Sequence, residues 1–159
     1  MTSSEVPHLA EVPAQKVAYI AAHGSYEMLP AQMIELAMWF GRQAIDLGGH
    51  PGATYNNDPD QADEDDLDWE VWIPTNAAVR ERESVDGQIG VKTLKAATCA
   101  ALVHLGSYET LDGSSGLLLQ WATEEGHVRN GPLQTIFLDD PADVPEDELK
   151  TLIRFPVKT

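Results

Sequence analysis

The residues best suited to chemistry lie in a short apolar segment, Trp69 to Ile73, which reads Trp-Glu-Val-Trp-Ile. Side chains alternate between the two faces of a strand, so Glu70 and Trp72 would project together from one face. A carboxylate is costly to bury unless it is paired or protonated, which makes a glutamate within an apolar strand informative. Two interpretations stay open: Glu70 belongs to an enclosed site, or it lies on an edge strand in solvent, as the acidic stretch before it suggests.

Other chemical motifs are weak or absent from the sequence. The acidic run Asp58 to Glu70 lacks the glycine and glutamate positions of a helix-loop-helix calcium site and predicts a solvated loop. The histidines include no pair four residues apart, so no zinc site is expected, and the single cysteine, Cys99, is expected to be a small buried hydrophobe. No serine-nucleophile, phosphate-loop or dinucleotide pattern occurs, and we expect neither a metal nor a cofactor.

The elements that would position these residues follow from an internal repeat. Two segments that read Gly-Ser-Tyr-Glu, at 24–27 and 106–109, lie 82 residues apart. We therefore predict a single domain over residues 1–159, built of two copies at about 9–74 and 91–156 and a polar linker at 75–90. Two copies are too few for a solenoid, so a closed pair with a pseudo-two-fold axis is expected. Without a gap, the same offset superposes Leu36 on Leu118, Trp39 on Trp121, Gly49 on Gly131 and Pro74 on Pro156.

Each copy is predicted to contain a strand, a helix and two further strands. Apolar runs at 17–22 and 99–104 suit buried strands, and apolar residues at helical spacing follow each Gly-Ser-Tyr-Glu turn. Glycines stop the helices, and each copy then continues as two strands, of which the second ends at a proline that cannot donate to the ladder. This order predicts an α+β fold with a mainly antiparallel sheet, helices on one side and a cleft between the repeats. The strands after the helices are expected at 53–56, 69–73, 135–138 and 151–155.

The aromatic residues follow the same repeat, and Trp39 and Trp121 share a helical position. Aromatic residues at equivalent positions are commonly packing anchors, but a tryptophan can also wall a cleft, stack on a flat ligand or attract a cation. Tyr19 corresponds to Ala101 in the other copy, an asymmetry that would leave room for a ligand on one side. The predicted ligand-binding residues are Glu70, Trp72, Trp39, Trp121, Tyr19, Tyr55, Tyr108 and Phe137.

Composition limits the classes of function. The chain has 159 residues, with 26 Asp and Glu against 10 Lys and Arg, which gives a formal net charge of -16. Its 43% hydrophobic content indicates a soluble globular domain. The acid surplus opposes nucleic-acid binding, because that binding depends on Lys and Arg. No apolar run approaches the roughly 20 residues that span a bilayer, and no signal peptide is recognisable, so no membrane partner and a cytoplasmic location are expected.

Several motifs together resemble the GyrI-like small-molecule-binding family, also called the bacterial effector-binding domain. The resemblance covers nearly the whole chain and is carried by the G-x-Y-E turn, Trp121, the D-P-x-D-V-P-x-x-E-L-x-T segment at 140–151 and the closing I-x-F-P-V at 153–157. It implies the same duplicated strand-helix-strand-strand fold. Family members supply effector pockets to multidrug-responsive transcription regulators or stand alone. Some protect cells from toxins, and one branch resembles hydrolases that open reactive cyclopropane rings.

The resemblance also implies a role for Glu70. In drug-binding members, a carboxylate on the closing strand of a repeat lies in an aromatic pocket and meets a cationic or polar ligand. The first copy has Glu70 at this position and the second has Leu152, so only Glu70 can fill the role. Regulators of this family carry a DNA-binding segment before the effector domain, and about a dozen residues precede the first predicted strand here. We therefore expect a stand-alone protein that does not itself bind DNA.

Three functional hypotheses follow, and all leave the oligomeric state open. The first is a binding module that captures a hydrophobic, aromatic or cationic drug or toxin in an aromatic cleft, with Glu70 as the orienting charge. The alternative is a cofactor-independent hydrolase in which Glu70 activates water against a cyclopropane-type toxin. The third is an acidic protein that inhibits gyrase by competing for a basic groove.

Overall fold

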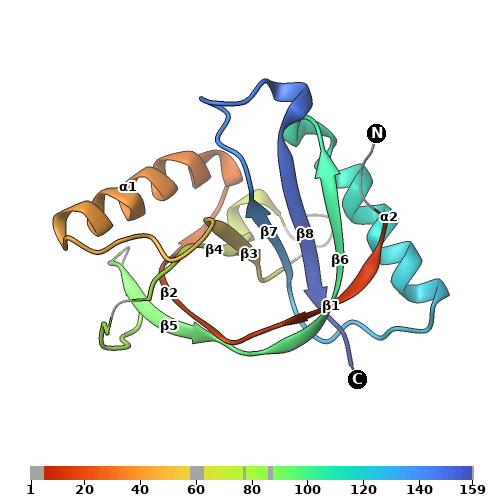
Figure 1. Cartoon of the computed structure of the whole chain (residues 1–159), viewed down its shortest axis with the longest axis horizontal. Helices are drawn as coiled ribbons and strands as arrows, with labels where there is room; N and C mark the ends of the chain where they lie inside the picture. Colours follow the sequence, from red (N-terminus) through yellow and green to blue (C-terminus); the bar gives the residue numbers. More distant parts are fainter. Residues whose placement is uncertain (1–5, 58–62, 77, 86–87, 159) are drawn as a thin grey trace. The chain divides into compact units, whose positions relative to one another are not determined.

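The structure is a computed structural model of the chain, and it describes residues 6–57, 63–76, 78–85 and 88–158 (Figure 1). Short 3-10 turns precede both helices and both closing strands: η1 (Tyr26–Met28), η2 (Glu64–Asp66), η3 (Tyr108–Thr110) and η4 (Glu146–Glu148). The helices and strands in chain order are β1 (His8–Val12), β2 (Gln15–His23), α1 (Leu29–Arg42), β3 (Gly52–Tyr55), β4 (Asp68–Pro74), β5 (Gly90–Leu94), β6 (Ala97–Leu105), α2 (Leu111–Glu124), β7 (Leu133–Phe137) and β8 (Lys150–Pro156).

The element bounds reproduce the sequence repeat. The bounds of β1, β2, α1 and β4 recur 82 residues later as those of β5, β6, α2 and β8. The predicted α+β class with mainly antiparallel pairing is confirmed. The predicted order lacked β1 and β5, which are short strands with a mixed polar pattern and therefore give no clear apolar signal. Each copy thus begins with a strand that the hydrophobic pattern did not reveal.

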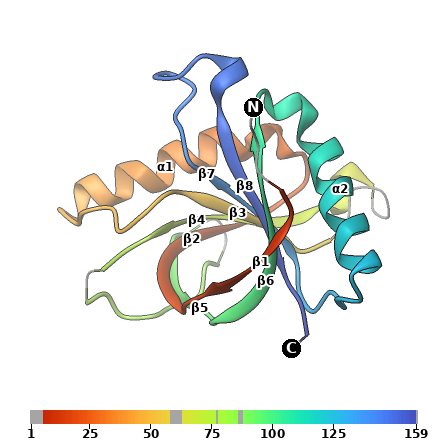
Figure 2. The same ribbon diagram turned by 45° about the vertical axis from the view of Figure 1, so that its right-hand side comes forward.

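The first strands are exchanged between the two copies. β1 pairs with β6 and β5 pairs with β2, both antiparallel, with Leu9 opposite Ala100 and Val91 opposite Ala18. The chain accordingly divides into two compact units, Ala14–Lys95, and Ala96–Thr159 with Met1–Pro13. We call them the 14–95 unit and the 96–159 unit. The strand order is β3-β4-β2-β5 in the former, where Figure 2 shows β5 beside β2, and β1-β6-β8-β7 in the latter.

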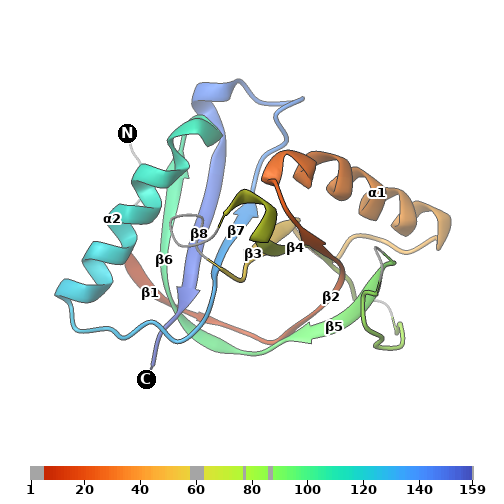
Figure 3. The same cartoon turned by 180° about the vertical axis from the view of Figure 1, so that it is seen from behind.

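One face of each four-stranded sheet packs on a helix. In the 96–159 unit, α2 lies beside β6 (Figure 3), and its buried Leu118 and Ala122 belong to one hydrophobic cluster with residues of β6 and β8. α1 likewise contacts β4 and β2 in the 14–95 unit and buries Leu36, Trp39 and Phe40. By the repeat offset, the strand residues on this helix-covered face are Ala18, Ile20, Val71 and Ile73, which match Ala100, Leu102, Ile153 and Phe155.

The repeated Gly-Ser-Tyr-Glu segment builds the entry to each helix. Gly24 and Gly106 have φ values of 94° and 120°, a region that favours glycine. The following serine then caps a 3-10 turn, because its Oγ accepts a hydrogen bond of 3.1 Å from the backbone N–H of Glu27 or Glu109. The motif therefore has a structural role in both units.

Across the part of the chain that the structure describes, no helix has the length and apolar character needed to cross a membrane. The acidic run considered as a calcium loop falls only partly within these residues. Its first part, 58–62, lies outside them, and the remainder forms η2 and the start of β4.

Candidate functional site

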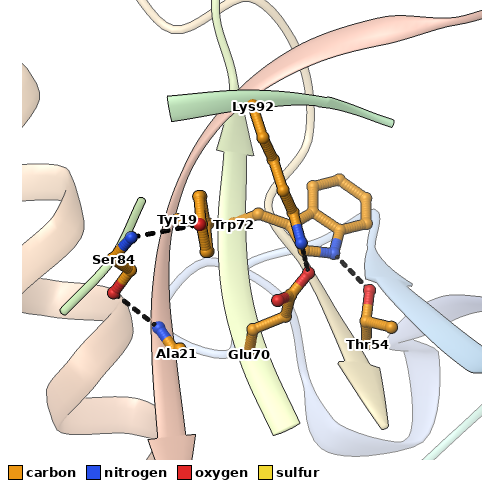
Figure 4. Close-up of polar contacts among 7 residues, drawn as sticks. All are labelled: Tyr19, Ala21, Thr54, Glu70, Trp72, Ser84 and Lys92. Carbon is orange, nitrogen blue, oxygen red and sulfur yellow. Dashed lines mark hydrogen bonds and ion pairs between the residues drawn. The ribbon is translucent and has the colours of Figure 1, made fainter. Parts of the chain in front are cut away.

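A polar and aromatic group of side chains lies on the face of the 14–95 sheet opposite α1. Along β4, Glu70 and Trp72 alternate with the helix-facing residues. Cross-strand pairing places Tyr19 of β2 opposite Trp72, and Thr54 of β3 opposite Glu70. Figure 4 shows these side chains together with Ala21, whose backbone contacts Ser84. We call the following six residues the Glu70 cluster: Tyr19, Thr54, Glu70, Trp72, Ser84 and Lys92.

Glu70 is buried at the centre of this sheet. β4 lies between β3 and β2, and Glu70 is only 7% exposed. The interpretation of Glu70 as an edge-strand residue in solvent is therefore wrong. Its carboxylate Oε1 accepts a hydrogen bond from Lys92 Nζ, and the two side chains form an ion pair. This partner offsets the cost of burying the carboxylate.

Lys92 also contacts an aromatic ring. Its ammonium nitrogen lies 4.4 Å from the centroid of the Tyr19 ring, within the range of a cation–π interaction. Lys92 belongs to β5, the last strand of this sheet, and its side chain extends past Tyr19 of β2 to reach Glu70 of β4 (Figure 4). A carboxylate and an aromatic ring thus both contact one ammonium group.

The segment before β5 fixes the Tyr19 ring. The backbone N–H of Ser84 donates to the Tyr19 hydroxyl over 3.0 Å, and Ser84 Oγ accepts from the backbone N–H of Ala21 over 3.0 Å. Paired backbone hydrogen bonds of 2.9 and 2.8 Å join Arg82 to Val91. At Gly90, a Cβ atom would lie 2.7 Å from Tyr19 Cε1, so only glycine allows this approach.

Trp72, the neighbour of Glu70 on the same face of β4, is held by a hydrogen bond to β3. It is 1% exposed, and its indole Nε1 donates a hydrogen bond of 2.9 Å to Thr54 Oγ1. Both groups of that bond are buried. The ring and the hydroxyl therefore form a fixed wall of the cluster.

The other predicted residues of the 14–95 unit lie elsewhere. Tyr55 points to the opposite face of the sheet, where Tyr26 packs against it and against Trp69, with ring centroids 5.2 and 5.8 Å apart. Trp39 packs edge-on against Phe40 in the α1 core, with centroids 5.4 Å apart. Among the predicted set, the structure brings together Tyr19, Glu70 and Trp72.

Three predicted residues belong to the 96–159 unit. Trp121 packs near His127, with ring centroids 5.5 Å apart, and Tyr108 packs against Phe137 at 5.7 Å. Burial raises the pKa of the Tyr108 phenol, and the nearby carboxylates of Asp140 and Asp139 add to this shift. These three aromatic residues therefore pack around α2 and the turn that precedes it.

The corresponding face of the 96–159 unit has different chemistry. Leu152 stands at the position of Glu70 and Ala101 at that of Tyr19, while Arg154 replaces Trp72. Arg154 Nε donates to Gln134 Oε1 over 2.7 Å, and burial lowers the pKa of this guanidinium. Cys99 is buried on the same face, and burial raises the pKa of its thiol.

Lys92, Ser84 and Thr54 were missed from the sequence. Lys92 interrupts a short apolar run, which is a weak signal, and only the strand exchange brings it beside Glu70. Within the described residues, no group of three His, Cys, Asp or Glu side chains is arranged to hold a metal ion. The cluster instead has the chemistry of a cation site, with a carboxylate and an aromatic face around one position.

The fold and this cluster define a duplicated α+β binding domain. The chain belongs to the GyrI-like family, because the model of the GyrI-like small molecule binding domain matches residues 6–158. It is therefore a small-molecule-binding domain. A search of curated proteins finds no significant match.

Solved structures with the same fold come from proteins of several kinds. EcmrR in its complex with DNA superposes with a TM-score of 0.82 at 18% identity over 97% of this chain, which spans 57% of the EcmrR chain. A hydrolase encoded by lin2189 from Listeria innocua gives a TM-score of 0.69 at 15% identity, covering 96% of this chain and 91% of that one. SAV2435 bound to tetraphenylphosphonium gives 0.60 at 12% identity, covering 97% and 94%. At these identities the likeness extends to the fold alone.

Proposed function

We propose that this protein captures a lipophilic organic cation, such as a drug or toxin, at the Glu70 cluster. The observation that carries the proposal is that an ammonium group in this cluster already contacts both the Glu70 carboxylate and the Tyr19 ring. A large organic cation is weakly hydrated, so its transfer to such a position costs little desolvation, while the ring and the carboxylate supply attraction. The buried Trp72 beside Glu70 makes the surroundings of the carboxylate apolar, which strengthens its attraction for a cation.

Two comparisons support this ligand class. The family is one of small-molecule-binding domains. SAV2435, which shares the fold, is bound to tetraphenylphosphonium, a lipophilic cation. The proposal therefore names the chemical class that a buried carboxylate and an aromatic face would select.

The proposal is tested by titrating tetraphenylphosphonium and a panel of aromatic cations into wild type and Glu70→Gln, followed by calorimetry. We expect the Kd for the cations to rise at least about tenfold in Glu70→Gln, because the amide lacks the opposing charge. Glu35→Gln is the matched control, since Glu35 is exposed on α1 of the same unit. The proposal is wrong if no cation binds wild type, or if Glu70→Gln binds as wild type does.

A second candidate function is hydrolysis of a reactive cyclopropane-type toxin, with Glu70 as the base that activates water. The shared fold with the Listeria innocua hydrolase favours it. The ion pair with Lys92 opposes it, because a proton taken up by Glu70 would leave the Lys92 ammonium without its countercharge. Mass spectrometry after incubation with a cyclopropane-containing alkylator tests this function. Water addition that Glu70→Gln abolishes would support hydrolysis, and unchanged substrate at high protein concentration would exclude it.

Inhibition of gyrase by the acidic surface is the remaining hypothesis. It rests on the net charge of -16 and on no specific contact among the described residues. A DNA supercoiling assay with excess protein tests it, and undiminished supercoiling would reject it.

A further inference from the structure

We propose that Lys92 is a built-in competitor of the ligand: its ammonium occupies the cation position between Glu70 and Tyr19, and a ligand binds when this side chain swings out to solvent. The inference rests on the proposed function, because it concerns the same cluster. It makes Lys92 a specificity-determining residue, which selects the kind of cation that the protein can capture.

The position of Lys92 allows it to leave. It stands on β5, the edge strand of the 14–95 sheet, whereas Glu70 stands on the internal strand β4. The Lys92 side chain is 35% exposed, against 9% for the Glu70 side chain. A lysine stem that starts at a sheet edge can rotate into water without moving the backbone. In this ion pair, Lys92 is therefore the mobile partner and Glu70 the fixed one.

The remaining cluster is held without Lys92. The Tyr19 hydroxyl accepts from the Ser84 backbone N–H, and the absence of a side chain at Gly90 lets the Tyr19 ring and the backbone of Arg82 and Ser84 approach this residue closely. Trp72 is fixed by its hydrogen bond to Thr54. Departure of the lysine would thus leave a carboxylate and an aromatic face already in place for another cation, which lowers the ordering cost of binding.

The competitor discriminates between cations. A small primary amine in solution has the same charged group as Lys92, but the tethered group competes at a high effective concentration. A large aromatic cation differs because it also buries apolar area against the rings, while the released ammonium regains its hydration. The site should therefore exclude small hydrophilic amines and accept bulky lipophilic cations. In the free protein, Lys92 keeps the Glu70 carboxylate from being buried unpaired.

The size of the effect follows from population arithmetic. The apparent Kd equals the intrinsic Kd divided by the fraction of molecules in which the position is open. If Lys92 is withdrawn in about one molecule in ten, removal of its charge would tighten cation binding about tenfold. Loss of the ion pair in the free protein acts in the same direction, because the unpaired carboxylate then gains more from the ligand.

The first experiment titrates tetraphenylphosphonium into Lys92→Met and the matched control Lys95→Met by calorimetry. Lys95 is exposed directly after β5, so both variants change the net charge equally. We expect Lys92→Met to bind about tenfold more tightly than wild type and Lys95→Met to stay within about twofold. Equal affinities in the two variants would overturn the inference, and so would weaker binding by Lys92→Met, which would show that Lys92 contributes to ligand binding.

A second measurement uses a small amine as the probe. Butylammonium should show no binding to wild type and measurable binding to Lys92→Met, because the vacated position then accepts an untethered ammonium. Equal binding of butylammonium to both proteins would also overturn the inference. Thermal unfolding of both variants confirms that they are folded before titration.

A third measurement needs no substitution. Saturating tetraphenylphosphonium should increase the rate at which Lys92 of wild type is acetylated several-fold relative to Lys95, measured by mass spectrometry of peptides. Bound ligand with an unchanged Lys92 rate would overturn this inference and leave the proposed function intact. No binding by either wild type or Lys92→Met would overturn both.

Discussion

The two units share their strands and helix, yet they differ on the sheet face that the helix does not cover. On the helix-covered face, equivalent positions are apolar in both units, as in Val71 with Ile153 and Ile20 with Leu102. On the other face, the 14–95 unit has the Glu70 cluster, and the 96–159 unit has unrelated residues. Helix packing restricts one sheet face of each unit to apolar residues that fit together. The opposite face is free of this restriction, so it can differ between the units and carry a site in one of them. The residues that replace Tyr19, Glu70, Trp72 and Lys92 are Ala101, Leu152, Arg154 and Ala10.

The helix entry turns differ in a second way. In the 96–159 unit, the buried His104 bonds through Nε2 to the Ser107 carbonyl at 2.9 Å and through Nδ1 to Ser114 Oγ at 2.6 Å. In the 14–95 unit, the indole of Trp69 instead donates to the Gly24 carbonyl over 2.9 Å. The turn is therefore anchored by β6 in one unit and by β4 in the other. Two turns with the same sequence can thus be held by hydrogen bonds from different strands.

The largest effect is expected from truncating Trp72, which sharpens the comparison with Arg154 at the equivalent position. Trp72→Ala removes a fully buried indole and should lower the free energy of unfolding by about 3–5 kcal/mol. Arg154→Ala removes a partly buried hydrogen bond to Gln134 and should lower it by about 1–3 kcal/mol. Urea unfolding followed by circular dichroism measures both. Equal losses would contradict the expectation that the buried Trp72 contributes more to stability than Arg154 at the equivalent position.

A smaller effect is expected at Gly90, whose counterpart is His8. Gly90→Ala would place a Cβ atom 2.8 Å from the Arg82 carbonyl oxygen and against the Tyr19 ring, and should cost about 1–3 kcal/mol. His8→Ala is the matched control, because His8 is exposed at the equivalent position of β1 and its removal should change stability by less than about 0.5 kcal/mol. Thermal unfolding tests the pair. A Gly90→Ala protein as stable as wild type would show that Tyr19 is not tightly held.

The smallest effect is expected from Tyr108→Phe and is confined to alkaline pH. Because the folded state raises the pKa of Tyr108, the neutral phenol contributes stability below the unfolded pKa of about 10, and this is lost as the pH rises through the folded pKa. Wild type should therefore lose more stability than Tyr108→Phe above about pH 10, with no difference at neutral pH. Parallel unfolding curves over the pH range, with absorbance of tyrosinate as a second signal, measure this. Identical losses of stability at alkaline pH in wild type and Tyr108→Phe would contradict the raised pKa of Tyr108.

Much of the fold was predictable because the repeat is written in the sequence without gaps. The offset that aligns the two Gly-Ser-Tyr-Glu turns also relates the bounds of α1 to those of α2. β1 and β5 could not be predicted, since their mixed patterns carry no period and their partners lie in the other copy. Pairing between strands far apart in sequence is a property of tertiary structure, which local patterns do not encode.

The candidate site was predictable in part for a different reason, the alternation of side chains along a strand. Strand alternation alone placed Glu70 and Trp72 on one face, and the structure agrees. Alternation could not assign Tyr55, because a residue's face depends on the register of its own strand. Lys92 was beyond reach, since its ion pair with Glu70 forms only through the pairing of β5 with β2.

The exchanged first strands also determine which stretch of the gene carries the site. All six residues of the Glu70 cluster lie within Ala14–Lys95, a continuous segment as long as one repeat but shifted from the copy that the motifs outline. Recombination after Pro74 would separate the glutamate from its lysine, whereas exchange at Pro13 and Lys95 would transfer the cluster whole. For engineered chimeras of such duplicated domains, the transferable module is therefore the segment that begins at β2 and ends with β5.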